Sequence, residues 1–274
     1  MFTPDLLAGK RILITGGGTG LGAAMGRRFA ELGANLVICG RRSQVLEEVA
    51  TQWREQFSID VQTIECDVRR GEQVESMMDA IWARAPLDVL VNNAAATFVA
   101  QTEKMSFRAA DAILAPTLHG AMYCTMACGR RWIEAGHPGT VLSILSTSTI
   151  TGRAYTVPSS IAKSGLLAMT RSLAVEWGPH GVRLVAIAPG FFPTPGASGQ
   201  LAISKQAPRE QRVPLGRVGE HAELANLASY LVSDGAAYIT GEMVTIDGGT
   251  HLRTSGVEDL VAWSDTDWAA LRRG

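Results

Sequence analysis

Long apolar runs are absent from this 274-residue sequence, and so is an excess of charge of one sign. No segment approaches the roughly 20 apolar residues that a membrane-spanning helix needs, and residues 1–10 lack the basic start and apolar core of a secretory signal. The formal net charge of −1 gives no general field for attracting nucleic acid or an anionic membrane. We therefore expect a cytoplasmic protein whose partner is a small molecule, with no nucleic acid or membrane bound.

Cysteine is scarce as well, with four residues and no spacing typical of a disulfide framework. Cys39 and Cys66 lie in apolar, strand-like runs, where cysteine behaves as a small hydrophobic residue. Cys124 and Cys128 are one helical turn apart, but no nearby cysteine or histidine pair completes a four-ligand site. We expect buried free thiols and no metal.

Short β-rich runs alternate with longer helical patterns along the chain. Because such alternation is typical of parallel sheets covered on both faces, it predicts an α/β, doubly wound Rossmann fold with a seven-stranded parallel sheet. The predicted strands are Arg11–Thr15, Asn35–Cys39, Val61–Cys66, Val89–Val91, Thr140–Ile144, Arg183–Ala188 and Met243–Ile246. The predicted helices begin near Leu21, Ser43, Gly71, Ser106, Ser159 and His221.

No repeat, low-complexity tract or Gly/Ser linker divides the sequence, so we expect one domain over residues 1–274. Residues 191–219 carry several prolines and glycines between the sixth strand and the last long helix. So long a connection usually has a functional reason. We interpret it as a mobile substrate lid, and residues 250–274 as a C-terminal tail.

A glycine-rich turn, TGGGTGLG at residues 15–22, follows the first predicted strand and leads into a helix. Glycines permit a tight turn and close approach of a pyrophosphate, while the helix N-terminus offers unpaired N–H groups and a favourable dipole. This context predicts a dinucleotide site, with cofactor contacts from Gly16, Gly18, Thr19, Gly20 and Leu21.

The residues after the second predicted strand read Cys39-Gly40-Arg41-Arg42 and contain no carboxylate. A Rossmann protein that binds NAD places an acid there for the ribose 2′-hydroxyl, whereas guanidinium groups match a 2′-phosphate bidentately. Arg41 and Arg42 therefore favour NADP(H) as the cofactor.

Several motifs together resemble the short-chain dehydrogenase/reductase family. They are the glycine run, Cys66-Asp67-Val68, Val91-Asn92-Asn93-Ala94, and Ala188-Pro189-Gly190 with Thr194. The resemblance implies that Asp67 and Val68 hold the adenine and that Asn93, with Ala94, lies beside the adenosine. It also implies a nicotinamide carboxamide framed by Pro189, Gly190, Phe192 and Thr194, and, by analogy, a symmetric homotetramer.

Within that family the sequence is most similar to the 2,4-dienoyl-CoA reductases. The similarity lies in Asn92–Ala95, Pro158-Ser159 with Ala162-Lys163, Leu173–Gly178 and Glu223–Ala228, and it continues into the tail at Ser255-Gly256, Asp259-Leu260 and Trp268. This resemblance implies an acyl-CoA substrate with contacts at Arg69, Phe98, Ser106 and Ser159. A CoA-contacting arginine of that branch aligns with Gln200.

The family's catalytic Ser, Tyr and Lys fall on Ser146, Ser159 and Lys163, so the tyrosine is missing. Lys163 keeps the implied role of binding the nicotinamide ribose hydroxyls. Ser159 cannot replace a phenol as an acid, because its hydroxyl does not protonate an alkoxide readily. Dienoyl-CoA reductases also lack this tyrosine, since they deliver hydride to a conjugated carbon chain, and a hydroxyl donor to the thioester carbonyl suffices.

The group that supplies the final proton is not assigned by the sequence. The acids of the two dienoyl-CoA reductase types align with Ser148 and Thr117. Tyr155, eight residues before Lys163, is the only phenol near it in sequence, but the branch has a phenylalanine there, which favours a pocket wall.

Three hypotheses therefore stand. The first is an NADPH-dependent reductase of an unsaturated acyl-CoA, the second a carbonyl reductase of the 3-oxoacyl type using Tyr155 as its acid, and the third a non-catalytic NADP(H)-binding protein.

Overall fold

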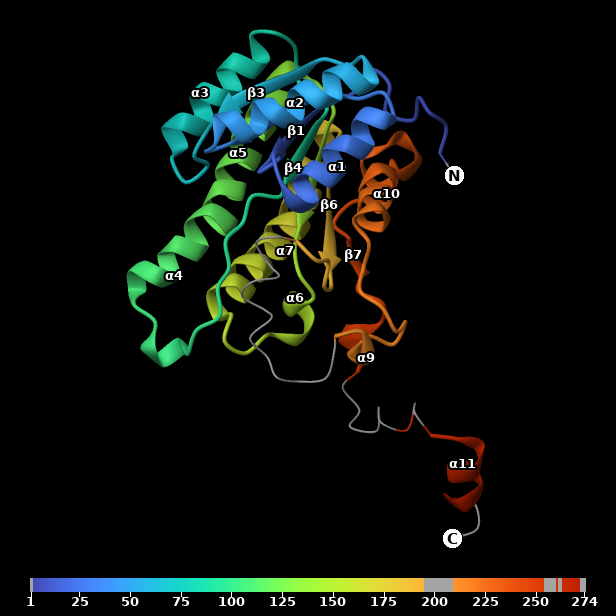
Figure 1. Cartoon of the computed structure of the whole chain (residues 1–274). Coiled ribbons are helices and arrows are strands. Elements are labelled where there is room, and N and C mark those ends of the chain that lie inside the picture. The colour runs from blue at the N-terminus through green and yellow to red at the C-terminus, as the bar shows by residue number, and fades with distance from the viewer. Residues whose placement is uncertain (1, 195–208, 254–259, 261–262, 272–274) are drawn as a thin grey trace.

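The computed structural model describes residues 2–194, 209–253, 260 and 263–271 (Figure 1). Over this part of the chain the strands are β1 (Arg11–Thr15), β2 (Asn35–Gly40), β3 (Val61–Glu65), β4 (Val89–Asn92), β5 (Gly139–Ile144), β6 (Val182–Pro189) and β7 (Met243–Ile246). The helices are α1 (Gly20–Glu31), α2 (Ser43–Phe57), α3 (Gly71–Trp82), α4 (Phe107–Leu114), α5 (Gly120–Ala135), α6 (Ser148–Thr151), α7 (Val157–Trp177), α9 (Arg209–Arg212), α10 (His221–Val232) and α11 (Asp265–Leu271).

The strands form a seven-stranded sheet in the order β3-β2-β1-β4-β5-β6-β7, and all neighbouring pairs are parallel. This confirms the predicted α/β, doubly wound fold. Each observed strand agrees with its predicted range to within one residue at either end. The strands could be predicted from the sequence because most of their residues are buried on both faces of the sheet. Each strand therefore appears as a short continuous apolar segment.

Helices cover both faces of the sheet, and side chains that alternate along each strand divide the core between them. Ile12 and Ile14 of β1 pack with apolar side chains of α1, α2 and α10, whereas Leu13 between them packs with those of α3, α5 and α7. Figure 1 shows these two helical layers on opposite sides of the strands. All four cysteines are buried and unpaired in the structure, as the sequence predicts, and Cys124 and Cys128 belong to the second layer.

The strand order reverses direction between β1 and β4, which are neighbours although some 75 residues separate them along the chain. Connections leave these two strands toward opposite sides, so a crevice opens beyond their carboxyl ends. In Figure 1 this edge of the sheet faces the short helices α6 and α9.

One predicted helix differs in the structure. The segment expected to begin near Ser106 forms α4 and α5 joined by a π-helical turn, Ala115–His119. Pro116 lies in this turn and has no backbone N–H to donate, so an uninterrupted α-helical hydrogen-bond ladder cannot pass through it.

The proposed lid and tail are described only in part. Residues 191–194 and 209–219 of the lid segment lie beside the carboxyl edge of the sheet, and residues 195–208, including Gln200, lie outside the described residues. No helix in the described ranges is both long and apolar enough to span a bilayer.

Candidate active site

A cleft of about 800 Å³ lies at the carboxyl edge of the sheet, beyond the ends of β1, β4, β5 and β6. Its walls come from the start of α1, the loop after β4, the segment that leads from β5 through α6 into α7, and the residues after β6. This volume is within the usual range of roughly 300–1,000 Å³ for small-molecule sites. Eleven predicted site residues line it: Gly20, Leu21, Asn93, Ser146, Tyr155, Ser159, Lys163, Pro189, Gly190, Phe192 and Thr194.

The ends of β1 and β4 are fastened together by Thr15, a buried residue. Its hydroxyl donates to the carbonyl of Val91 at 3.3 Å and accepts the backbone N–H groups of Asn93 and Ala94, each at 3.0 Å. The side-chain amide of Asn93 donates in return to the carbonyl oxygens of Thr15 (3.0 Å) and Gly16 (3.3 Å). Asn93 is therefore held at the crevice by contacts to the glycine-rich turn.

The glycine-rich turn allows no bulk at two of its positions. Gly16 has a φ of +66°, a conformation that residues with a side chain rarely adopt. A Cβ atom on Gly22 would lie 2.4 Å from the carbonyl oxygen of Gly16. Helix α1 begins directly after this turn with no acidic residue in its first turn and no side-chain cap from Thr19, so its first N–H groups stay available to an anion.

Arg41 and Arg42 follow β2 at the same edge and are exposed. Across from them, after β3, Asp67 accepts two hydrogen bonds from the Nε of Arg69, at 2.8 and 2.9 Å. The bonds from Arg69, and to a smaller degree the charge of Arg41, lower the pKa of the Asp67 carboxyl. The carboxylate of Asp67, after the neighbouring strand, is therefore already engaged in an ion pair.

Lys163 lies in α7 and is buried at the base of the cleft. Its Nζ donates to the carbonyl of Ile144, the last residue of β5, at 2.5 Å. Burial of the ammonium lowers the pKa of Lys163 to about 8. Ser159 lies one helical turn earlier on the same side of α7 and also lines the cleft.

Ser146 follows the end of β5 and lines the cleft opposite α7. Its Oγ accepts the backbone N–H of Ser148 at 3.3 Å, which leaves the hydroxyl proton to donate elsewhere. The predicted set of Ser146, Ser159 and Lys163 is therefore brought together at one cavity.

Tyr155 lines the cleft in the loop that enters α7 and is 57% exposed. Its backbone has a φ of +61°, a left-handed conformation that costs a non-glycine residue roughly 1–2 kcal/mol. The carbonyl of Tyr155 accepts the N–H of Ala100 at 2.9 Å, which ties this loop to the loop after β4. This exposure favours a place for Tyr155 at the mouth of the cleft over a role as a buried acid beside Lys163.

Thr117 occupies the π-helical turn and is fully buried. Its hydroxyl accepts the N–H of Ala96 at 3.0 Å and donates to the carbonyl of the same residue at 3.3 Å. The single hydroxyl proton is used in holding the loop after β4, so it is not directed toward a substrate in the cleft.

The charged residues that line the cleft are all cationic. Arg153 and Arg212 join Lys163, and no carboxylate or imidazole occurs among the described lining residues. The sequence interpretation missed both arginines. Arg153 had a signal, because it lies two residues before Tyr155 in the loop that enters α7, but Arg212 is 49 residues from Lys163 and its position depends on the fold.

Comparison with known proteins gives the family. A family model described as "Enoyl-(Acyl carrier protein) reductase" matches residues 16–251. The chain belongs to the short-chain dehydrogenase/reductase family. This is a family of oxidoreductases that bind nicotinamide cofactors.

Among its relatives, a probable 2,4-dienoyl-CoA reductase of Bacillus subtilis is 38% identical over 247 residues, which cover 89% of this chain and 97% of the relative. A short-chain dehydrogenase structure from Bacillus anthracis is 40% identical, with a TM-score of 0.81 and coverage of 89% and 98%. A gluconate 5-dehydrogenase from Burkholderia cenocepacia, in complex with NADP and tartrate, is 27% identical, with a TM-score of 0.86 and coverage of 92% and 99%.

Other residues predicted for substrate contact lie outside the cleft lining. Arg69 is held by Asp67, and Phe98 is half-buried in the loop after β4. Ser106 caps α4, where its hydroxyl accepts the N–H of Ala109 at 3.2 Å. Of the four positions predicted for substrate contact, Ser159 is the one that lines the cavity.

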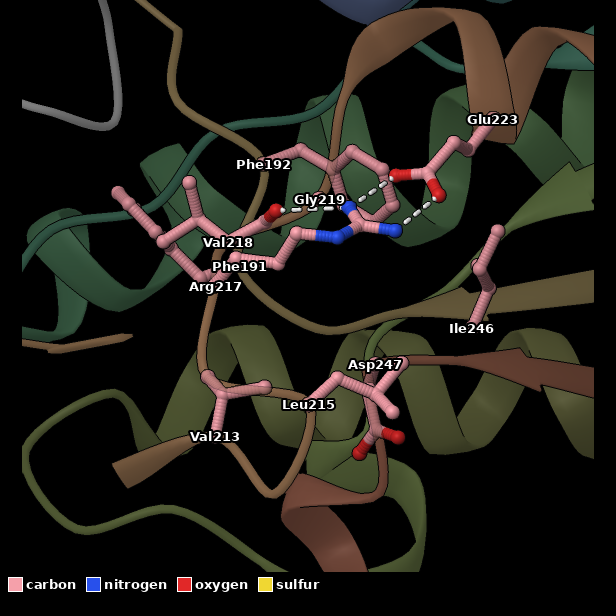
Figure 2. A pocket seen from close by; sticks show the side chains of 11 residues that line it. Phe191, Phe192, Val213, Leu215, Arg217, Val218, Gly219, Glu223, Ile246 and Asp247 are labelled. Atoms are coloured by element: carbon pink, nitrogen blue, oxygen red, sulfur yellow. Dashed lines mark hydrogen bonds and ion pairs between the residues drawn. The ribbon is translucent and has the colours of Figure 1, made fainter. Parts of the chain in front are cut away.

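A second, much smaller cavity of about 80 Å³ lies behind the cleft, between Phe191–Phe192, residues 213–219 and the end of β7. Figure 2 shows Arg217 reaching across it to Glu223 of α10, with contacts of 2.8 and 2.6 Å. These bonds, followed by the N–H of Glu220, lower the pKa of Glu223 to about 2. The ion pair holds the segment 213–219 to α10. It thereby helps to place Val213, at the start of this segment, and the preceding Arg212 at the cleft.

Replacing Thr15 with valine tests the junction of β1 and β4. Valine keeps the shape but leaves the N–H groups of Asn93 and Ala94 without an acceptor, each worth about 1–3 kcal/mol when buried. We expect urea unfolding to show a loss of about 2 kcal/mol or more. Thr170→Val is the matched control, because Thr170 is equally buried and its hydroxyl bonds only the carbonyl of Leu166 in its own helix. Equal losses in the two variants would contradict the assigned role of Thr15.

Proposed function

We propose that this protein is an NADPH-dependent reductase of an unsaturated acyl-CoA thioester, of the 2,4-dienoyl-CoA reductase type. The observation that carries the proposal is the composition of the cleft around Lys163. A serine, Ser159, stands one turn before the lysine where the family's tyrosine would be, and the cavity's charged groups are cationic. The similarity to a relative named as a probable 2,4-dienoyl-CoA reductase supports the same reading.

The choice of NADPH rests on the end of β2. Arg41 and Arg42 are exposed there, no acid follows the strand, and the nearby Asp67 is engaged by Arg69. A ribose 2′-phosphate fits two guanidinium groups, whereas a 2′-hydroxyl would lack its usual carboxylate partner. The related gluconate 5-dehydrogenase binds NADP, which is consistent with this assignment.

The residues of the chain divide the work as follows. The turn at Gly16–Gly20 and the N-terminus of α1 bind the pyrophosphate, Asp67, Val68 and Asn93 line the adenosine side, and Pro189–Thr194 contact the carboxamide. Lys163 donates hydrogen bonds to the ribose hydroxyls. When bound, the cofactor supplies a hydride to the conjugated carbon chain, and a proton from solvent, taken up by the resulting enolate, completes the reduction.

Ser159 and Ser146 supply hydroxyl donors at the substrate. A donor aimed at the thioester oxygen stabilises the enolate charge that develops as the chain is reduced, and one such donor contributes about 3–4 kcal/mol. This chemistry needs a polarised carbonyl and does not need a strong acid at the oxygen. That requirement agrees with a cleft that holds serine in place of tyrosine.

A carbonyl reductase is the second candidate, favoured by one observation: Tyr155 lines the same cleft as Lys163. In that case its phenol would protonate the alkoxide formed from a ketone. The exposure of Tyr155 at the mouth of the cleft weighs against it.

Oxidation of NADPH with a panel of substrates decides between the candidates. Purified protein should consume NADPH with a 2,4-dienoyl-CoA and leave simple ketones and 3-oxoacyl thioesters unchanged. Consumption with ketones alone would favour the carbonyl reductase, and binding of NADPH without turnover of any substrate would favour a non-catalytic protein.

Arg41→Ala should weaken NADPH binding by about tenfold or more, because a charge-assisted hydrogen bond to the 2′-phosphate is lost. NADH binding should not change. Titration of both cofactors by fluorescence measures the effect, with Arg108→Ala, a change at another exposed arginine, as the control for net charge. An equal loss of affinity for NADPH and NADH, or a preference of the wild type for NADH, would contradict the assignment of Arg41 to the 2′-phosphate.

The affinity for NADPH should depend on pH through Lys163. The ammonium is the donor to the ribose, and its pKa is lowered to about 8, so the charged form predominates below pH 8 and is lost above it. Affinity should be level well below pH 8, begin to fall as the pH approaches 8, and fall by up to about tenfold per pH unit above it. In Lys163→Met the affinity should be lower and this dependence should vanish. A variant that retained the wild-type profile would show that another group titrates.

Tyr155→Phe should keep dienoyl-CoA reductase activity, because the ring still packs in the wall and only an exposed hydroxyl is removed. Ser159→Ala should lower kcat by about 10²-fold or more, since a donor to the thioester is lost. Steady-state kinetics with both variants measures this contrast. The reverse pattern, with Tyr155→Phe inactive and NADPH binding intact, would replace the first proposal with the carbonyl reductase.

A further inference from the structure

Two arginines face the outer part of the cleft from segments far apart in the chain. Arg153 lies in the loop between α6 and α7, and Arg212 ends α9. In Figure 1 these short helices lie beyond the carboxyl edge of the sheet. Both side chains line the cavity whose base holds Lys163 and Ser159.

The positive charge of Arg212 reaches Arg153. Partial burial of Arg153 at the cleft wall lowers its pKa, and the positive charge of Arg212 lowers it further. Two cations that line one cavity give it a positive potential, and an anionic ligand placed between them would be stabilised by both.

The loop that carries Arg153 contains a strained backbone conformation at Tyr155. Tyr155 adopts its left-handed conformation two residues later, and the N–H of Ala100 fixes its carbonyl. The hydroxyl of Thr156 donates to the carbonyl of Arg153 at 3.4 Å. Strained backbone of this kind persists where surrounding contacts determine it, and it is common at ligand sites.

The nicotinamide end of the cofactor does not need these arginines. Its pyrophosphate is assigned to the glycine-rich turn and its 2′-phosphate to Arg41 and Arg42, which follow β1 and β2, whereas Arg153 and Arg212 face the cleft from beyond β5 and β6. The cationic pair is therefore placed for the other occupant of the cavity.

We propose that Arg153 and Arg212 form an anion-binding site at the mouth of the cleft that receives a phosphate of the substrate's CoA moiety. This inference rests on the proposed function for the identity of the anion. The thioester would lie at Ser159, and the phosphates would extend outward to the arginines, so that the pair selects CoA thioesters over neutral thioesters of the same acyl chain. Both arginines are specificity-determining residues and take no part in the chemical step.

The test compares two substrates with the same dienoyl chain, one a CoA thioester and the other an N-acetylcysteamine thioester that has no phosphate. Arg153→Gln and Arg212→Gln should each raise KM for the CoA thioester by about tenfold, with kcat unchanged, because the lost contact is equal in ground and transition states. KM for the N-acetylcysteamine thioester should not move. Added salt should raise the wild-type KM for the CoA thioester alone.

Arg171→Gln is the matched control, since Arg171 is an exposed arginine of α7 that does not line the cleft. It should behave as wild type with both thioesters. Equal rises in KM for the two thioesters in Arg153→Gln and Arg212→Gln would assign the arginines a structural role and overturn the proposal, as would no change with either.

Calorimetry of free CoA with the NADPH-saturated protein tests the anion site without turnover. Binding should be about tenfold weaker in each arginine variant and unchanged in Arg171→Gln. If the wild type reduces neither thioester, the proposed function fails, yet weaker CoA binding in the arginine variants would still support the anion site. Wild-type protein that does not bind CoA, or that binds it no better than the variants, would overturn the inference.

Discussion

The hydroxyl of Thr15 joins the ends of two strands that the chain reaches some 75 residues apart, and the rest of the site depends on this junction. Where the strand order reverses between β1 and β4, the N–H groups of Asn93 and Ala94, beyond the end of β4, need an acceptor outside the sheet. Thr15 satisfies two of them, and the amide of Asn93 binds the turn that follows β1. The crevice is thus bounded by a fixed turn on one side and a fixed loop on the other.

Hydrogen bonds between segments distant in sequence also fix the other side of the cleft. Lys163 is tied to the last carbonyl of β5, Thr117 holds the loop after β4, and the N–H of Ala100 is bound by the carbonyl of Tyr155. Each contact links elements that are distant in sequence and adjacent in the sheet order. Among the described residues that line the resulting cavity, the charged ones are all cations, which favours anionic ligands.

The sequence predicted the framework well because the strands are buried on both faces. Runs such as Leu36–Cys39 contain no polar residue, so their bounds are clear in the sequence. The glycine-rich turn shows at which residue the first strand ends. The π-helical turn at Ala115–His119 was not predicted, although Pro116 marks its position, because a proline in a helical pattern does not specify how the broken hydrogen bonds are redistributed.

The site residues also fall into two groups: those that a local sequence motif places, and those whose surroundings depend on the fold. Ser146, Ser159 and Lys163 stand within 18 positions of one another, so β5, α7 and the segment between them bring them together, and the motif was sufficient. Arg69 and Ser106 were predicted for substrate contact, but local partners hold both, Asp67 for the guanidinium and the N–H of Ala109 for the hydroxyl. A motif match cannot reveal such pairing. Arg212 reaches the cleft through the return of the chain after β6, which no local pattern encodes.

The protonation state of Lys163 connects this architecture to the chemistry. Burial lowers its pKa to about 8, close to neutrality but on the charged side, so the amine still carries its third proton under ordinary conditions. In a site with a phenol four residues earlier, this charge would serve to acidify the phenol. With Ser159 in that place no group of suitable acidity receives the benefit, because an aliphatic hydroxyl remains un-ionised beside an ammonium. In the proposed function, this charge binds the ribose hydroxyls and adds positive potential next to a hydroxyl donor. Both effects would stabilise negative charge spread over a conjugated thioester, and neither delivers a proton to an isolated alkoxide. The arrangement therefore supports the proposal that the substrate is a polarised carbon–carbon double bond and not a simple ketone.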